Sequence, residues 1–176
     1  MLDLTKIKAI TLDLDDTLWP IAPTMHRAEG QLVAWLRSCA PQTADFMADP
    51  VRRLAMREQV LRGRPDLHHN LSAVREELIR QALLASGEDP GHAPAAFEVF
   101  FEARMQVQLF DDAAPALALL SQRFPVVALS NGNADVHRVG IGRHFKAAVS
   151  AHEFGVGKPD VRIFEASARA AGCRSV

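Results

Sequence analysis

The hydrophobic residues divide the chain into three stretches. Residues 7–14 form a short apolar, β-branched run between charged residues, which predicts a fully buried strand. From about residue 24 to residue 108 apolar side chains recur at helical spacing, and no strand pattern is present. After about residue 115 short apolar runs alternate with helical patterns again. The pattern therefore predicts a β/α domain that is interrupted by a helical insertion.

Four helices are expected in the insertion, because breakers separate its periodic segments. The first begins near residue 24 and is stopped by Pro41, and the second covers 49–61. The third runs from Asn70 to Gly87, and the fourth covers 94–108.

Strands and helices alternate in the remainder of the chain. Strands are expected at 125–129 and 147–150, and helices at 115–123, at 135–141 and between Pro159 and Gly172. Strand–helix–strand order predicts parallel pairing with right-handed crossovers. The expected fold class is therefore α/β, a doubly wound parallel sheet with an inserted helical segment.

The composition is that of a globular protein, with 48% hydrophobic and 23% charged residues. A net charge of -1 and a pI near 6.7 argue against binding to nucleic acid or to anionic membranes. No apolar run approaches the roughly 20 residues that span a bilayer, and residues 1–6 lack the basic stretch and apolar run that are typical of a signal peptide. Cys39 and Cys173 match no metal or disulfide spacing. We expect a cytoplasmic protein with no membrane partner.

Polar residues gather where the predicted strands end. Asp13 and Asp15 follow the first strand, Ser130 and Asn131 follow the second, and Lys158 precedes the last helix. Parallel sheets bind ligands beyond the carboxyl ends of their strands. Carboxylates there could hold a hard divalent cation, while hydroxyl, amide and ammonium groups neutralise phosphate oxygens. This set of residues indicates phosphoryl transfer.

Each polar cluster also has a purely structural interpretation. Asp-Asp-Thr is common in turns and helix N-caps, Ser-Asn-Gly in hairpin turns, and Lys-Pro in charged loops. A calcium-binding EF-hand loop is excluded, because it needs Gly where Leu18 stands and Glu where Thr24 stands. The order of the clusters and their positions after predicted strands favour the functional interpretation.

These clusters resemble the motifs of a known family. Residues 13–17, Asp-Leu-Asp-Asp-Thr, are similar to the D-x-D-x-T signature of haloacid dehalogenase-like phosphatases. Residues 129–132, Leu-Ser-Asn-Gly, resemble the second motif of that family, and Lys158-Pro159 resembles the third. Segments 12–18 and 127–133 most resemble a bacterial branch that acts on flavin mononucleotide and on the phosphorylated ribityl-aminopyrimidine of riboflavin synthesis.

The resemblance extends from about Lys6 to the C-terminus. It implies a Rossmann-like catalytic core at 1–20 and 110–176, with a helical cap at 21–109. The cap would close over the site and select the substrate. His69 and Arg75, expected on exposed cap helices, are candidates for contacts with the substrate.

The resemblance also implies residue roles. Asp13 would be the nucleophile that forms an aspartyl-phosphate. Asp15 would give a proton to the leaving oxygen and later take one from water. Ser130 would bind phosphoryl oxygens, and Lys158 would stabilise the nucleophile and the transferring group. The substrate would be a small phosphorylated metabolite.

Further ligands of the phosphate and the cation follow from the same resemblance. Thr17 and Asn131 would join Asp13, Ser130 and Lys158 in binding the substrate. Mg²⁺ would bind the Asp13 carboxylate and the backbone carbonyl of Asp15.

The family has a fourth motif, an acidic pair after a further parallel strand, and Val176 comes before it. We therefore expect the C-terminal part of the core to be missing, the metal site to be incomplete and a sheet edge to be exposed, which favours a homo-oligomer. Two alternatives stay open: a phosphotransferase or mutase of the same family, and a non-catalytic binding protein with the same fold.

Overall fold

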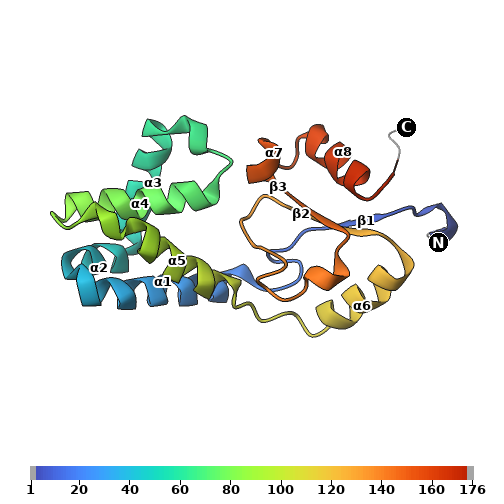
Figure 1. Ribbon diagram of the computed structural model, residues 1–176, viewed down its shortest axis with the longest axis horizontal. Coiled ribbons are helices and arrows are strands. Elements are labelled where there is room, and N and C mark those ends of the chain that lie inside the picture. The colour runs from blue at the N-terminus through green and yellow to red at the C-terminus, as the bar shows by residue number, and fades with distance from the viewer. Residues whose placement is uncertain (1–2, 174–176) are drawn as a thin grey trace. The chain divides into compact units, whose positions relative to one another are not determined.

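The structure is a computed structural model that describes residues 3–173. This part of the chain forms two compact units, shown in Figure 1. The α/β unit contains the chain up to Ile21 and from Val107 onward, and the helical unit contains Ala22–Gln106. Within the described residues, no helix combines the length and the apolar character needed to cross a membrane.

Three parallel strands form the sheet of the α/β unit, in the order β1-β2-β3. They are β1 (Ile10–Leu12), β2 (Val126–Ser130) and β3 (Ala147–Ser150). All five residues of β2 are buried, as expected for a central strand covered on both faces. The parallel α/β sheet predicted from the sequence is therefore confirmed, although β1 is shorter than the predicted strand at 7–14.

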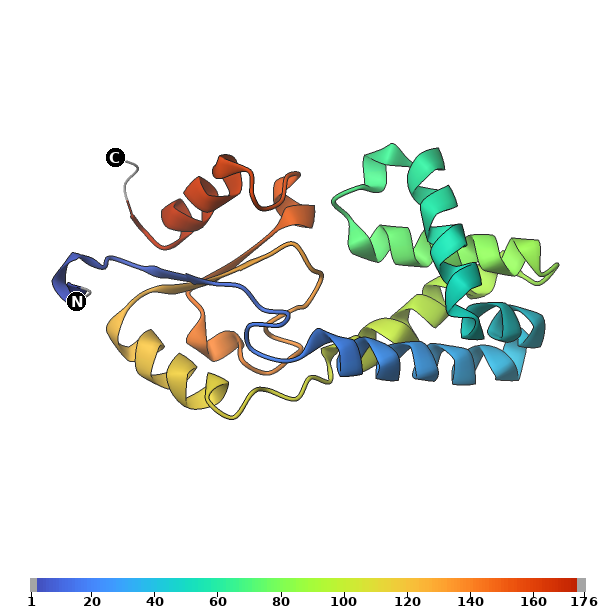
Figure 2. The ribbon, with the colours of Figure 1, turned by 180° about the vertical axis from the view of Figure 1, so that it is seen from behind.

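Helices cover both faces of this sheet. Figures 1 and 2 show α6 (Ala113–Arg123) and α8 (Val161–Ala170) on opposite faces. Neighbouring residues of β2 point to opposite faces, so Ala128 packs in the cluster that contains Leu117 of α6, and Leu129 packs with Ile163 of α8. The sheet is therefore doubly wound.

Two local expectations for this unit were wrong, and one short helix was missed. Residues 136–140, in the segment predicted as a helix at 135–141, form turns that end at Gly140, with φ +90°. Pro159 does not open the last helix: α8 begins at Val161, because the Asp160 side chain accepts a hydrogen bond from the Arg162 N–H and caps that end. A short helix, α7 (Ala151–Phe154), was not expected.

The helical unit contains five α-helices among its described residues, one more than predicted. They are α1 (Ile21–Cys39), α2 (Pro41–Ala48), α3 (Pro50–Gly63), α4 (Leu71–Ala85) and α5 (Ala93–Met105). Pro41 ends the first helical pattern but also opens α2, at a position where the missing N–H has no cost. Short 3₁₀ turns lie at Leu4–Lys6, Pro65–Leu67, Pro90–His92 and Gly142–His144.

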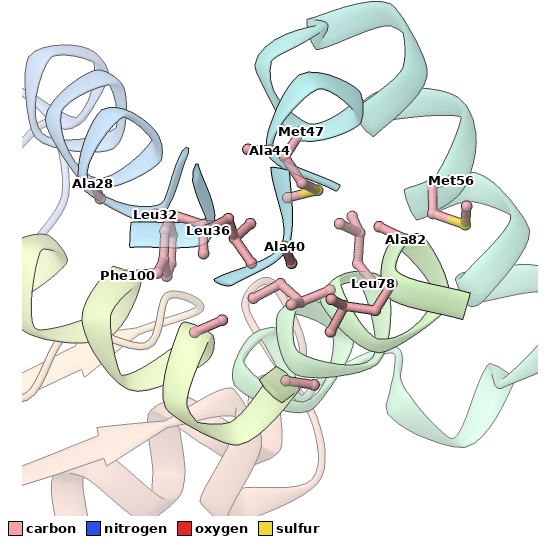
Figure 3. Packing of buried hydrophobic residues seen from close by; sticks show 14 of the residues in the cluster. Ala28, Leu32, Leu36, Ala40, Ala44, Met47, Met56, Leu78, Ala82 and Phe100 are labelled. Carbon is pink, nitrogen blue, oxygen red and sulfur yellow. The ribbon is translucent and has the colours of Figure 1, made fainter. Parts of the chain in front are cut away.

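A core of leucine, alanine and methionine side chains holds the helical unit together (Figure 3). Leu32 and Leu36 of α1 and Ile79 and Leu83 of α4 are completely buried. The buried alanines allow the helices to approach closely, and the larger side chains fill the space between them. The labelled part of this core consists of Ala28, Leu32, Leu36, Ala40, Ala44, Met47, Met56, Leu78, Ala82 and Phe100.

Arg75 is not the exposed side chain that the sequence suggested. Only 16% of its side chain is exposed, its Nη1 lies 2.8 Å from Glu29 Oε1, and its guanidinium lies 4.3 Å from the centre of the Phe100 ring. Burial lowers the pKa of Arg75, and the Glu29 carboxylate opposes that shift. Arg75 therefore stabilises the core of the helical unit, whereas His69 is exposed as expected.

Glu88 caps helix α2 from a distant part of the sequence. Ala40, at the N-cap of α2, has no side chain that could accept the free N–H groups. The Glu88 carboxylate accepts them instead, from Gln42 N at 3.1 Å and from Thr43 N at 2.8 Å, and it also accepts the Thr43 hydroxyl at 2.6 Å. Desolvation acts to raise the pKa of Glu88, but these hydrogen bonds outweigh it and lower the pKa.

Replacing Glu88 with Gln should destabilise the protein by about 1 kcal/mol at neutral pH, because the cap loses its charge and one acceptor. Since the pKa of Glu88 is lowered in the folded state, its contribution is present above the ordinary value of 4.5 and is lost as the pH falls below it. Urea unfolding at several pH values measures the difference. The exposed Glu58→Gln is the matched control and should change stability little.

Candidate active site at the carboxyl edge of the sheet

A tight turn follows β1 and carries the first polar cluster. The buried Leu14 carbonyl accepts hydrogen bonds from Thr17 N at 3.2 Å and from Leu18 N at 2.8 Å. Asp16 takes a left-handed conformation, with φ 57°, which an aspartate tolerates in turns. This turn reverses the chain directly after Asp13, so that the acids of the cluster stay at the end of the strand.

Asp15 is held from two sides. Its Oδ1 accepts a hydrogen bond of 2.8 Å from the indole Nε1 of Trp19, which is completely buried. Its Oδ2 lies beside Gly132, where a Cβ atom would be only 2.6 Å away. The Asp15 carboxylate therefore contacts the loop that follows β2 as well as its own turn.

Ser130 is the last residue of β2 and only 4% exposed. Its Oγ accepts a hydrogen bond of 2.9 Å from the Gly132 N–H. A Cβ at Gly132 would also lie 3.2 Å from this hydroxyl. Ser130, Gly132 and Asp15 therefore meet at one point of the carboxyl edge.

Lys158 reaches the nucleophile candidate directly. Its Nζ lies 2.7 Å from Asp13 Oδ1, with 23% of the lysine side chain and 41% of the aspartate side chain exposed. The distance permits a charge-assisted hydrogen bond. The partial exposure leaves this pair accessible to a small ligand.

Asn131 fixes the backbone of Lys158. Its Nδ2 donates to the Lys158 carbonyl at 2.9 Å, and its Oδ1 accepts from the Lys158 N–H at 2.7 Å. Gly157 allows this close approach, because a Cβ there would lie 2.7 Å from Asn131 Oδ1. Asn131, expected to bind substrate, therefore also orients the lysine.

Contacts thus connect five of the six predicted site residues: Asp13 with Lys158, Lys158 with Asn131, and Asp15 with Ser130 through Gly132. Thr17 lies in the turn with an exposed side chain.

Trp19, Gly132 and Gly157 contact the site but were not predicted from the sequence as functional residues. Gly132 is the last residue of the second motif and Gly157 directly precedes the third, and a glycine in such a place is a signal for close backbone approach. The position of Trp19, four residues beyond Asp15, did not by itself predict an indole–carboxylate contact.

The oxygen atoms around Asp13 suit a hard cation. A carboxylate and a backbone carbonyl are donors that Mg²⁺ accepts, and Mg²⁺ keeps several water ligands. Among residues 3–173, no group of three or more His, Cys, Asp or Glu could hold a metal ion. The described residues therefore offer few protein ligands, with Asp13 and Asp15 as the candidates.

The chain is similar to known proteins. A model of the family described as haloacid dehalogenase-like hydrolase matches residues 7–174. The 5-amino-6-(5-phospho-D-ribitylamino)uracil phosphatase YigB of Escherichia coli K12 is 31% identical over 160 residues, which are 89% of this chain and 66% of that protein. The phosphoserine phosphatase of Thermus thermophilus is 35% identical over 96 residues, covering 51% of this chain and 39% of that protein.

A solved structure is also similar. The crystal structure of a 2-haloacid dehalogenase from Pseudomonas syringae pv. tomato DC3000 has a TM-score of 0.86 and 37% identity, covering 97% of this chain and 75% of that one. The chain thus spans about two thirds or less of the two curated relatives, at 66% and 39% of their lengths.

Asn131→Ala should loosen the backbone at Lys158, because both hydrogen bonds to it are lost. We expect faster hydrogen exchange of the Lys158 amide and a loss of stability of about 1 kcal/mol. Asn131→Asp keeps the Oδ1 acceptor and should give an intermediate exchange rate. Unchanged protection of the Lys158 amide in Asn131→Ala would contradict this role of the side chain.

Proposed function

Because the chain belongs to the haloacid dehalogenase-like hydrolase family, we propose that it is a magnesium-dependent phosphatase that hydrolyses a small phosphate monoester through an aspartyl-phosphate. The observation that carries the proposal is a pair of carboxylates at one sheet edge with different partners. Asp13 is bound to the Lys158 ammonium, and Asp15 is bound to the Trp19 indole. One carboxylate is thus oriented as a nucleophile and the other can serve as acid and base.

In the first step the Asp13 carboxylate attacks phosphorus, and the bond from phosphorus to the leaving oxygen breaks. Lys158, at 2.7 Å from Asp13, fixes the orientation of the carboxylate and places a positive charge next to the transferring group. Asp15 gives its proton to the leaving oxygen, so the product departs as an alcohol. The Ser130 hydroxyl donates a hydrogen bond to a phosphoryl oxygen and keeps its proton.

In the second step a water molecule attacks the phosphorus of the aspartyl-phosphate. Asp15, now ionised, takes a proton from this water, and the Asp13 carboxylate and inorganic phosphate are released. Thr17 and Asn131 are proposed to add polar contacts to the bound phosphate.

In the proposed cation site, the Asp13 carboxylate and the backbone carbonyl of Asp15 would hold Mg²⁺, which accepts such oxygen ligands together with water. Mg²⁺ in this position would supply positive charge against the phosphoryl oxygens.

We further propose that the helical unit acts as a cap, with 21–109 as the cap and 1–20 with 110–176 as the core. The core motifs specify only phosphate chemistry, so the selection of the alcohol part of the substrate falls to other residues. His69, exposed in the helical unit, remains a candidate for substrate contact, whereas the buried ion pair of Arg75 with Glu29 favours a structural role.

Dehalogenation is the second candidate, favoured by the 37% identity to the structure from P. syringae. An aspartate nucleophile could also displace halide from a haloacid, but halide departs without a proton. Proton donation by an acid such as Asp15, which is held by Trp19, helps an alkoxide to leave but does nothing for a departing halide. Asp15 therefore supports phosphate ester hydrolysis.

Assays of the purified chain separate these activities. The first assay measures phosphate release, with Mg²⁺ and with a chelator, from ribityl and flavin phosphates, phosphoserine and p-nitrophenyl phosphate. The second measures halide release from 2-chloropropionate. Chelator-sensitive phosphate release supports the proposal, halide release alone overturns it, and transfer to an added alcohol in preference to water indicates a phosphotransferase. The absence of all these activities would count against the proposal and favour the non-catalytic alternative.

Asp13→Asn should abolish phosphate release, by more than about 10³-fold, because an amide is a poor nucleophile and a poor metal ligand. Urea unfolding and circular dichroism should show an intact fold, since Asn is nearly the same size as Asp. Normal turnover by a folded Asp13→Asn protein would assign the nucleophile to another residue.

Asp15→Asn should slow hydrolysis of alkyl phosphates by about 10²–10⁴-fold. The loss on p-nitrophenyl phosphate should be much smaller, because nitrophenolate departs without a proton. The ratio of the two rates is the measurement. Equal losses on both substrates would count against Asp15 as the general acid.

A further inference from the structure

The buried indole of Trp19 is directed at the carboxylate proposed as general acid. Trp19 is 0% exposed, and its N–H can only donate. A buried indole N–H needs a partner, and here the partner is Asp15 Oδ1 at 2.8 Å. The contact thus satisfies a donor in the core and restrains a half-buried acid at the sheet edge at the same time.

The ring of Trp19 packs in the hydrophobic core of the α/β unit. It belongs to the buried cluster that contains Leu117 of α6 and Ala128 of β2. Its backbone carbonyl also accepts a hydrogen bond of 2.8 Å from the Asp16 N–H, across the turn that carries Asp15. Both the ring and the backbone of Trp19 are therefore held in place, so its indole N–H can restrain the Asp15 carboxylate.

Gly132 restrains Asp15 from the other side. A Cβ at Gly132 would come within 2.6 Å of Asp15 Oδ2, a distance that requires the carboxylate to move. The indole N–H and the absent side chain of Gly132 thus define the space that the Asp15 carboxylate occupies.

We propose that Trp19 is a positioning residue: its indole N–H, with Gly132 opposite, holds the Asp15 carboxylate where it transfers the proton to the leaving oxygen. The inference rests on the proposed phosphatase function. In this proposal Trp19 acts through Asp15, because its ring is buried and its one polar atom is bonded to Asp15 Oδ1. Misplacement of a reacting group by about 1 Å can cost about a hundredfold in rate, so the hydrogen bond matters beyond its contribution to stability.

The first experiment separates positioning from packing. Trp19→Phe keeps an aromatic ring in the core but removes the N–H. We expect phosphate release from an alkyl phosphate such as phosphoserine to fall about tenfold to a hundredfold, with a smaller loss on p-nitrophenyl phosphate. Trp35→Phe, which changes the other tryptophan of the chain, is the matched control and should leave the ratio of the two rates unchanged.

A double mutant tests whether Trp19 acts through Asp15. In the Asp15→Asn background, Trp19→Phe should cause no further change in the ratio of the two rates, because the general acid is already absent. Gly132→Ala leaves the core around Trp19 unchanged but displaces Asp15 Oδ2, so it should also slow alkyl phosphate hydrolysis more than hydrolysis of p-nitrophenyl phosphate. Equal losses of Trp19→Phe on both substrates, or an unchanged effect in the double mutant, would overturn the proposal in favour of simple packing.

A spectroscopic measurement does not depend on activity. The chain has two tryptophans, so its ¹⁵N–¹H spectrum contains two indole signals that Trp35→Phe assigns. Asp15→Ala should shift the Trp19 signal and leave that of Trp35 in place. If the signal shifts but the wild-type chain releases no phosphate, the proposed function fails although the contact exists. If the signal does not shift, the positioning proposal itself fails.

Discussion

The parallel pairing of β2 with a strand on each side is the constraint on which the site depends. Every residue of β2 is buried, and its register places Ser130 opposite Ser150 and Ala128 opposite Leu12. Because all three strands run in the same direction, their carboxyl ends meet at one edge of the sheet. The polar residues that follow β1 and β2 are therefore brought together by the backbone hydrogen bonds of the sheet.

Side-chain hydrogen bonds and an ion pair then fix the positions of the site residues at this edge of the sheet. Asn131, one residue beyond β2, binds the backbone of Lys158 through both polar atoms of its amide. Lys158 is thereby placed with its ammonium on Asp13, at the end of β1. The hydrogen bonds form between segments separated by 27 residues in sequence, and Gly157 provides the space for them. The position of the lysine therefore depends on the loop after the central strand as much as on its own segment.

Local pattern predicted the parallel sheet and most helices, because burial and helical periodicity leave a direct trace in the sequence. The site residues were inferred from their positions after the predicted strands and from the family resemblance, and their roles stay predictions. Features that depend on distant partners were missed. Pro41 ends one pattern but also opens α2, whose free N–H groups are capped by Glu88 from 45 residues away in the chain. Arg75 was predicted to be exposed, because the residues next to it in the sequence gave no sign of its ion pair with the distant Glu29. The contact between Trp19 and Asp15 likewise depends on the geometry of the turn.

Three aspartates, Asp13, Asp15 and Asp16, follow β1 closely, and they have different structural and chemical roles. Three carboxylates within four residues repel one another, and each is compensated by a different donor. Asp13 has the Lys158 ammonium, Asp15 has the Trp19 indole, and Asp16 accepts the Ile21 N–H at 2.8 Å, at the start of α1. Asp16 thus stabilises a helix N-terminus, where a negative charge is favourable. Only Asp13 and Asp15 remain directed at the shared edge, so the same turn anchors a helix and presents two carboxylates with separate chemical environments.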